Sequence, residues 1–274
     1  MKNLAILAAL STAVLVGAGH TSPLGGETAG VTPMQASQDF EWRGRVSRGD
    51  AIEIKGISGD IRAVSTSGDE VEVVAFKRGR DRDFDLVTFD VYEHSDGVTI
   101  CAMYPPKRAS RDYDCDRGGW HNADIDDIDV DVDFEVRVPQ GVVFVGRAIS
   151  GDVDAVGLTA EVVARTVSGD IDVSTTGLAR ASTVSGTIRA SMGRHDWSGE
   201  LAFTTVSGDI VLAVPDGLNA EVEFSAVSGQ MDSDFPITMQ GRSFWTSHLE
   251  GTIGDGGRQL KLKTVSGDVK LRRR

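Results

Sequence analysis

The second half of the chain repeats one five-residue phrase: an apolar residue, a polar residue, glycine, a second polar residue and another apolar residue. It occurs there seven times, as ISGDV, VSGDI, VSGTI, VSGDI, VSGQM, LEGTI and VSGDV, and an eighth copy, ISGDI, stands earlier. The phrase glycines are Gly59, Gly151, Gly169, Gly186, Gly208, Gly229, Gly251 and Gly267. The last seven are separated by 18, 17, 22, 21, 22 and 16 residues. A repeat of this length predicts a β-solenoid in which each copy marks one coil.

An extended copy of the phrase has a defined inside and outside. In residues 167–171 the two valine or isoleucine side chains and the glycine would face the core, and the serine and aspartate would face out. Glycine is expected where the coil bends, because a side chain there would collide with the neighbouring coil. The residues after the glycines should form an outer column that reads Asp152, Asp170, Thr187, Asp209, Gln230, Thr252 and Asp268. Because neutral residues interrupt this column, we interpret the aspartates as turn residues rather than as a calcium ladder.

The rest of the chain also predicts strands. Short alternating runs within 40–76 are typical of β-strands, and residues 77–127 break the rhythm with an antiparallel hairpin excursion and a long cysteine-bearing loop. The main repeats occupy 141–274, with hardly any helical pattern. The predicted fold class is therefore all-β: a stacked, single-stranded, parallel β-helix-like solenoid forming one domain over 39–274. The basic segment at 270–274 is expected to cap its open last coil.

The N-terminus has the parts of a secretory signal peptide. A lysine at position 2 precedes an apolar run from Leu4 to Val16 and the small residues Gly17, Ala18 and Gly19. Residues 1–19 are predicted to be a signal peptide, and the Gly, Ser, Thr and Pro-rich residues 20–38 a flexible linker. The alternative is a retained anchor, although the run is short for a membrane span. Export predicts a periplasmic or secreted protein that does not span the membrane after cleavage.

Cys101 and Cys115 are the two cysteines of the chain. An exported protein meets oxidising conditions, which favours a disulfide between them. Closing a loop of this length would stabilise the fold by roughly 3 kcal/mol. Two free thiols remain the alternative, and a metal pair is disfavoured because no histidine lies at ligand spacing.

A strongly alternating strand at 127–139 places acidic side chains on one face. Its carboxylates belong to Asp127, Asp129, Asp131, Asp133 and Glu135, with apolar residues between them. This face is the best candidate for a cation site. A single row lacks the convergent oxygens that calcium needs, so a solvated strand face is the favoured interpretation and no metal ligand is predicted.

The chain resembles the bacterial putative-adhesin family, a domain of unknown function found in envelope and stress-response proteins. Three features carry the resemblance: the tandem VSGD[IV] phrases, the approach FEVRVPQGVVFVGRAISGDV and the closing FPITMQGRSFWTSHLEGTIGDGGRQLKLKTVSGDVKLRRR. It covers about residues 40–274. The family implies a stacked β-helix-like fold and an extracytoplasmic, non-enzymatic role in adhesion or envelope sensing. It supplies no catalytic residues, and the excursion at 77–127 is longer than the family pattern needs.

Function is constrained mainly by exclusion. The formal charge of −13 disfavours nucleic acid as a partner. Asp152, Asp170 and Asp172 could lie together as in a β-helix polysaccharide lyase or hydrolase, but the repeat explains them, and no catalytic motif accompanies them. We expect a non-catalytic interaction or structural scaffold without a cofactor, whose partner is an envelope protein or a glycan. A calcium-dependent binding module is the third hypothesis. Aromatic residues in the irregular segments, Tyr104, Tyr113, Trp120, Trp197 and Trp245, are candidate contacts or end caps.

Overall fold

The structure is a computed structural model that describes residues 38–105, 115, 128–239 and 248–274. These residues fall in one compact unit, Ala36–Arg274. The predicted signal peptide, the linker before Gln38, most of the cysteine loop, Asp127, Tyr113, Trp120 and Trp245 lie outside the described residues.

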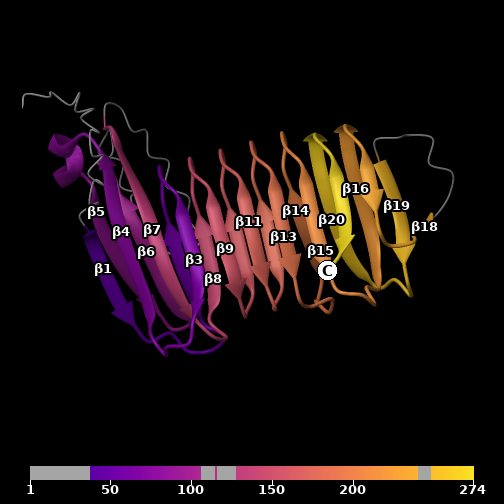
Figure 1. Ribbon diagram of the computed structural model, residues 1–274, viewed down its shortest axis with the longest axis horizontal. Coiled ribbons are helices and arrows are strands. Elements are labelled where there is room, and N and C mark those ends of the chain that lie inside the picture. Colours follow the sequence, from indigo (N-terminus) through magenta and orange to yellow (C-terminus); the bar gives the residue numbers. More distant parts are fainter. Residues whose placement is uncertain (1–37, 106–114, 116–127, 240–247) are drawn as a thin grey trace, which may run out of the picture. The chain divides into compact units, whose positions relative to one another are not determined.

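Two β-sheets make up this unit (Figure 1). Sheet A contains, in spatial order, β1 (Gln38–Gly44), β4 (Val71–Gly79), β7 (Val130–Pro139), β3 (Ile61–Thr66), β9 (Val153–Leu158), β11 (Ile171–Thr175), β13 (Ile188–Met192), β15 (Ile210–Val214), β21 (Val269–Arg273) and β17 (Met231–Ser233). Sheet B contains β18 (Thr238–Met239), β19 (His248–Ile253), β16 (Ala220–Ser228), β20 (Arg258–Ser266), β14 (Glu200–Thr204), β12 (Ala179–Ser182), β10 (Val162–Arg165), β8 (Val143–Arg147), β2 (Ala51–Lys55), β6 (Gly97–Met103) and β5 (Thr88–His94).

The all-β class is confirmed, but the coils are not single-stranded. From β8 to β17 successive strands alternate between sheet B and sheet A, so each coil contributes one strand to each sheet. The glycine phrase makes the turn from sheet B to sheet A. The return turn, for example at 159–161, has no comparable phrase, which is why the sequence signals only one strand per period.

The coils do not stack in chain order. Strands β20 and β21, the last in the sequence, lie between β14–β15 and β16–β17 (Figure 1). The basic segment at 270–274 therefore does not cap an open coil, as expected from the sequence, but has a strand on either side. At the other end β2 and β3 pair with β6 and β7, which follow them in the chain.

Antiparallel pairing occurs at both ends of the stack. Strand β4 pairs antiparallel with β1 and β7, and β5 and β6 form a hairpin whose second strand joins sheet B. Between β4 and β5 lies η1 (Asp81–Leu86), a 3-10 helix. The predicted hairpin excursion is thus built into the sheet. At the far end β19 pairs antiparallel with β16 and β18, which the sequence did not predict.

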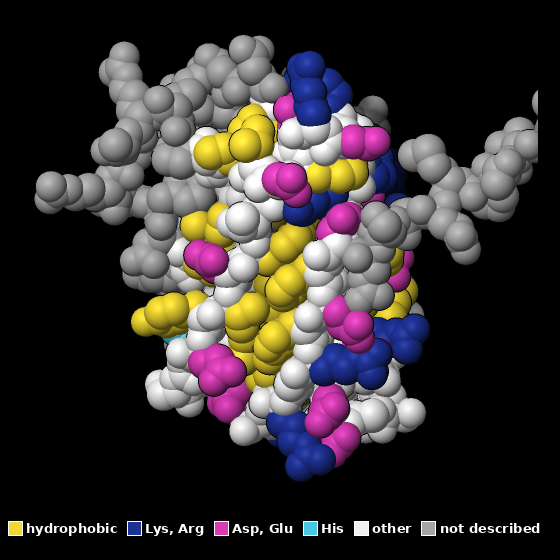
Figure 2. Space-filling model, turned by 90° about the vertical axis from the view of Figure 1, so that its left-hand side faces the viewer, with side chains coloured by type: hydrophobic (Ala, Val, Ile, Leu, Met, Phe, Trp, Pro, Cys, Tyr) yellow, Lys and Arg dark blue, Asp and Glu magenta, His cyan; other side chains and the backbone are white. Residues whose placement is uncertain are grey.

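Side chains from the inner faces of both sheets form the core. The largest fully buried ones include Tyr104, Phe134, Phe144, Phe203 and Phe224. In β7 the apolar residues are buried and the acidic ones face out, as the alternation predicts. At the β1/β5 end Phe40 and Phe89 stack with their ring centroids 4.7 Å apart. Figure 2 views this end and shows a strip of hydrophobic side chains between charged rims.

Candidate functional site

The phrase glycines form one stack along the turn from sheet B to sheet A. A Cβ atom on Gly151, Gly169, Gly186, Gly208 or Gly267 would overlap the carbonyl oxygen of the stacked glycine in the adjacent coil. Gly186, for example, would strike Gly169, and its φ of +152° is one that glycine adopts readily. Gly59 and Gly229 complete the stack. Gly251 does not belong to it: it lies within β19, opposite Val222, so its assignment to the repeat was wrong.

The aspartates that follow the glycines, together with Asp133 of β7, make a second, parallel stack of hydrogen bonds. Carboxylate oxygens accept from the backbone N–H of the next coil: Asp133 from Asp60 (2.9 Å), Asp60 from Asp152 (3.1 Å), Asp152 from Asp170 (2.7 Å), Asp170 from Thr187 (2.8 Å), Asp209 from Asp268 (2.8 Å) and Asp268 from Gln230 (3.0 Å). We call these residues the aspartate ladder. Its first four members are all acids, whereas in the column predicted from chain order only Asp152 and Asp170 are adjacent acids. Thr252 of that column is not part of the ladder. Their carboxylates serve the fold by satisfying amides between coils.

A threonine three residues before the glycine makes the matching contact on the other side of the turn. Its hydroxyl donates to the glycine carbonyl of the adjacent coil: Thr166 to Gly151, Thr183 to Gly169, Thr205 to Gly186 and Thr264 to Gly208, at 3.0–3.2 Å. All four threonines are buried. The sequence carried this signal, since the longer phrase TVSG recurs four times, but the five-residue window omitted it.

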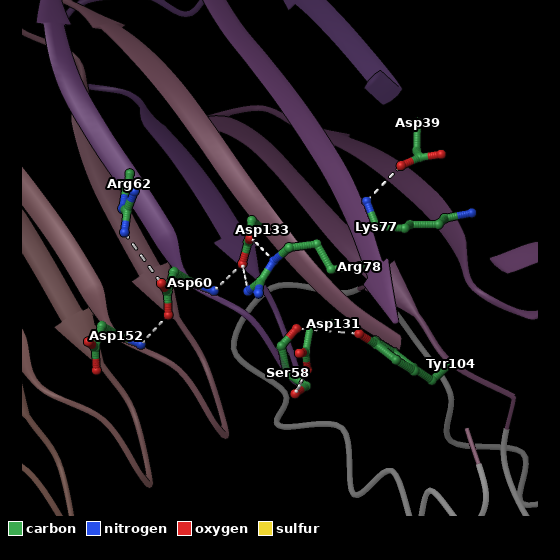
Figure 3. Close-up of polar contacts among 10 residues, drawn as sticks. All are labelled: Asp39, Ser58, Asp60, Arg62, Lys77, Arg78, Tyr104, Asp131, Asp133 and Asp152. Carbon is green, nitrogen blue, oxygen red and sulfur yellow. Dashed lines mark hydrogen bonds and ion pairs between the residues drawn. The ribbon is translucent and has the colours of Figure 1, made fainter. Parts of the chain in front are cut away.

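The acidic face of β7 is occupied by contacts within the protein (Figure 3). Asp133 binds the guanidinium of Arg78, with Nη2 and Oδ1 2.8 Å apart, as well as the amide of Asp60. Asp131 accepts from the Ser58 hydroxyl, and Asp129 pairs with Arg80 at 3.2 Å. Glu135 is exposed on the same face. Across the described residues no group of three or more His, Cys, Asp or Glu side chains is placed to hold a metal ion.

The environment of Asp133 shifts its pKa. Burial favours the neutral carboxyl, but hydrogen bonds from Arg78 and from the Asp60 amide, with the positive charges of Arg78 and Arg62, outweigh burial and hold the pKa below its ordinary value. The folded state therefore gains stability from ionised Asp133 above the pKa of the unfolded chain. This stability is lost as the pH falls through the lower pKa of the folded state.

Replacing Asp133 with asparagine should reduce the free energy of unfolding at pH 7 by about 1–2 kcal/mol, since it removes charge-assisted hydrogen bonds to Arg78. The difference from the wild type should shrink as the pH is lowered below about 4, because the unfolded wild-type chain then takes up a proton at Asp133, and it should be lost once the folded state is protonated at lower pH. Urea unfolding followed by circular dichroism at several pH values measures this. Asp69→Asn, at an exposed carboxylate, is the control and should change stability by less than about 0.5 kcal/mol. A deficit that stays constant down to pH 2 would contradict the interpretation.

In five of the phrases the first apolar residue does not enter the core, although Ile57 of the first copy does. Val167, Val184, Val206, Val265 and Val227 are 40–68% exposed. The second apolar residue is buried in the first four of these phrases, as at Ile171 and Ile188. The serines at the second position of the phrase bridge from coil to coil, from Ser150 through Ser168, Ser185 and Ser207 to Ser266. The valines therefore form a surface row, which we call the valine row. The expectation that both apolar positions face inward was wrong, because the chain turns the corner between the sheets here.

Other candidate residues have structural contacts. Cys101 and Cys115 form a disulfide with Cα atoms 5.9 Å apart. Trp197 is buried, and its indole N–H donates to the carbonyl of Gln259. Tyr104 is buried and donates its hydroxyl to the carbonyl of Val130 at 3.1 Å. Neither ring is a surface contact. Of the acids considered for catalysis, Asp152 and Asp170 belong to the aspartate ladder.

The family model described as Toastrack DUF4097 matches residues 144–272. This segment is similar to the Toastrack DUF4097 family. The Toastrack segment holds the stack from β8 to β21, which includes the valine row and most of the aspartate ladder. No curated protein matches the chain.

Solved structures of two bacterial proteins are similar to the chain. One is described as a putative cell adhesion protein from Clostridium sporogenes (TM-score 0.42, 6% identity, 86% of this chain and 99% of that one). The other is described as a putative adhesin from Bacteroides fragilis (TM-score 0.38, 14% identity, 85% of this chain and 96% of that one). In the described part of the chain, no helix has both the length and the apolar character to cross a bilayer.

Proposed function

We propose that this protein is a non-catalytic β-solenoid that acts as an interaction scaffold at the cell envelope, in the periplasm or outside the cell. The valine row carries the proposal. Five large apolar side chains in register on one edge expose a continuous apolar strip, and such strips on soluble proteins are typical of binding surfaces. The aspartate and threonine contacts between coils hold the strip in place. The predicted signal peptide and the family resemblance support the location.

The partner we propose for the valine row is an envelope protein rather than a lipid or a glycan. The aspartate ladder runs beside the row, three residues further along the phrase, so the carboxylates of Asp170, Asp209 and Asp268 flank the apolar strip. A matching surface would carry apolar side chains next to lysine or arginine. An anionic lipid surface would be repelled by these aspartates.

Replacing Val184 and Val206 together with serine should weaken binding to this partner by tenfold or more, since about 1.5 kcal/mol is lost for each buried valine. Both side chains are nearly half exposed, so the thermal midpoint should stay close to that of the wild type. The matched control is Val64→Ser with Val156→Ser, a paired and equally exposed set on sheet A outside the row.

The measurement is pull-down from solubilised envelope fractions, followed by titration of the recovered protein against wild type, row variant and control. Loss of affinity in the row variant alone supports the proposal; equal affinity of all three proteins refutes it. Incubation with envelope polysaccharides tests the alternative of a lyase or hydrolase, because new reducing ends or unsaturated products would show catalysis. A melting temperature that rises with calcium and falls with chelator would instead favour the calcium-dependent module.

A further inference from the structure

A pocket of about 290 Å³, lined by both charged and apolar side chains, lies on the outer face of sheet B, across β5, β6, β2, β8, β10 and β12. The register aligns Arg147 of β8 with Arg165 of β10, and Arg180 of β12 with Val163 of β10. All three arginines line this pocket, which we call the arginine pocket. The formal charge of the protein is −13, so its overall charge does not attract anions. An anion could therefore be held at this face only by the three cations on these adjacent strands.

Two of the three arginines are neutralised by acids of the same pocket. Arg147 pairs with buried Glu53, with Nε and Oε1 2.6 Å apart, and Glu53 also accepts from the Thr99 hydroxyl at 3.1 Å. Arg180 donates to Glu161 at 2.9 Å and to the backbone carbonyl of Glu200.

The third arginine has no such partner. Within the described residues the guanidinium of Arg165 makes no ion pair and no hydrogen bond, although it lies beside two other cations. Partial burial and the positive charges of Arg147 and Arg180 lower its pKa, with a smaller opposing effect of Glu53. An anion placed against Arg165 would relieve this repulsion, and a planar guanidinium suits a carboxylate bound by two parallel hydrogen bonds.

The remaining lining favours a sugar over a simple ion. Val145 and Val163 form a half-buried apolar floor next to the arginines, suited to the C–H face of a pyranose ring. Glu161 and His94 line the same pocket and can exchange hydrogen bonds with hydroxyl groups. The volume is near the lower limit for ligand pockets, which suits one sugar ring.

We infer that this pocket binds a carboxylated sugar unit, a uronic acid residue of an acidic glycan, with Arg165 as the carboxylate ligand. The inference extends the scaffold role but rests on different residues from the valine row. The proposed function can therefore fail while this site stands, and the reverse also holds.

The test is calorimetric titration of the full-length protein with a galacturonic acid trimer, with neutral maltotriose as the control ligand. Arg165→Gln should weaken binding of the acidic trimer by at least about tenfold. Arg189→Gln removes an equal charge from the outer face of sheet A and should leave binding unchanged. Because Arg165 is exposed and unpaired, Arg165→Gln should fold with a wild-type thermal midpoint, and the Val184/Val206 double variant should bind the trimer normally.

Each outcome of the titration either supports or overturns the assignment of a uronic acid site. Binding of the acidic trimer that depends on Arg165 and is absent for maltotriose supports the inference. It is overturned by undetectable binding to the wild type at millimolar trimer, by equal affinity of Arg165→Gln, or by equal affinity for maltotriose. Displacement of the trimer by inorganic sulfate at equal concentration would show a general anion site and would overturn the assignment to a sugar.

Discussion

Replacing Gly186 with alanine is expected to destabilise the protein by about 4 kcal/mol, from backbone strain and overpacking together. The added Cβ would overlap the carbonyl oxygen of Gly169, and the φ of +152° is unfavourable for any side chain. A flexible side chain could move aside, but the obstacle here is backbone held in the middle of the glycine stack. The coils on both sides would have to separate, which breaks the hydrogen bonds of the aspartate and threonine residues.

Gly199→Ala is the matched control. Gly199 also has a positive φ, +72°, but nothing lies within 4 Å of the position that its Cβ would take. The expected loss is about 1 kcal/mol, from conformation alone. Urea unfolding of both variants separates the contribution of backbone strain from that of overpacking between the coils. Equal losses in the two variants would show that close approach of the coils is not what requires glycine in the stack.

The second large effect is expected from Arg147→Met, which leaves the Glu53 carboxylate buried without its cation. Glu53 is only 5% exposed, and its Oε1 atom has no aligned hydrogen bond besides the ion pair with Arg147. Removing one partner of a buried pair costs about 3 kcal/mol or more, because the remaining charge loses both water and its counter-ion.

Adding Glu53→Gln to Arg147→Met should restore most of the lost stability, since no buried charge then remains. Arg165 lies opposite Arg147 on the neighbouring strand and could replace it, so Arg147→Met with Arg165→Gln should be less stable than Arg147→Met alone. Guanidinium chloride unfolding of these variants and of the two single glutamine variants completes the double-mutant cycle. A loss in Arg147→Met that Glu53→Gln does not recover would point to lost packing instead.

Local chemistry explains why much of the fold is readable in the sequence. Alternation along β7 predicts which of its side chains are buried, because neighbouring residues in a strand face opposite sides. The glycine positions are readable for a similar reason, since one tight turn recurs in each coil. Gly251 was misassigned because LEGTI matches the phrase by residue type while its neighbours place it in an antiparallel strand.

The candidate sites were harder to predict from the sequence than the fold. The arginine pocket combines residues from strands far apart in the chain, and neither Arg165 nor Glu53 stands in a motif. The valine row was assigned to the core because strict alternation was carried through a corner where the chain changes sheets. The acids of β7 looked like a cation site because their partners Arg78, Arg80 and Ser58 lie more than forty residues away.

By itself the sequence determined the all-β class, the coil length and the residues at each turn, because these follow from side-chain alternation and from the local needs of one bend. Only the tertiary structure decided which coils are neighbours. The phrases TVSGD at 205–209 and 264–268 are identical, so each could stack on either side of another coil. Hydrogen bonds such as that from the Asp268 amide to Asp209, 59 residues away, and the packing of the sheets around them select the order. That order creates the aspartate ladder, the valine row and the arginine pocket.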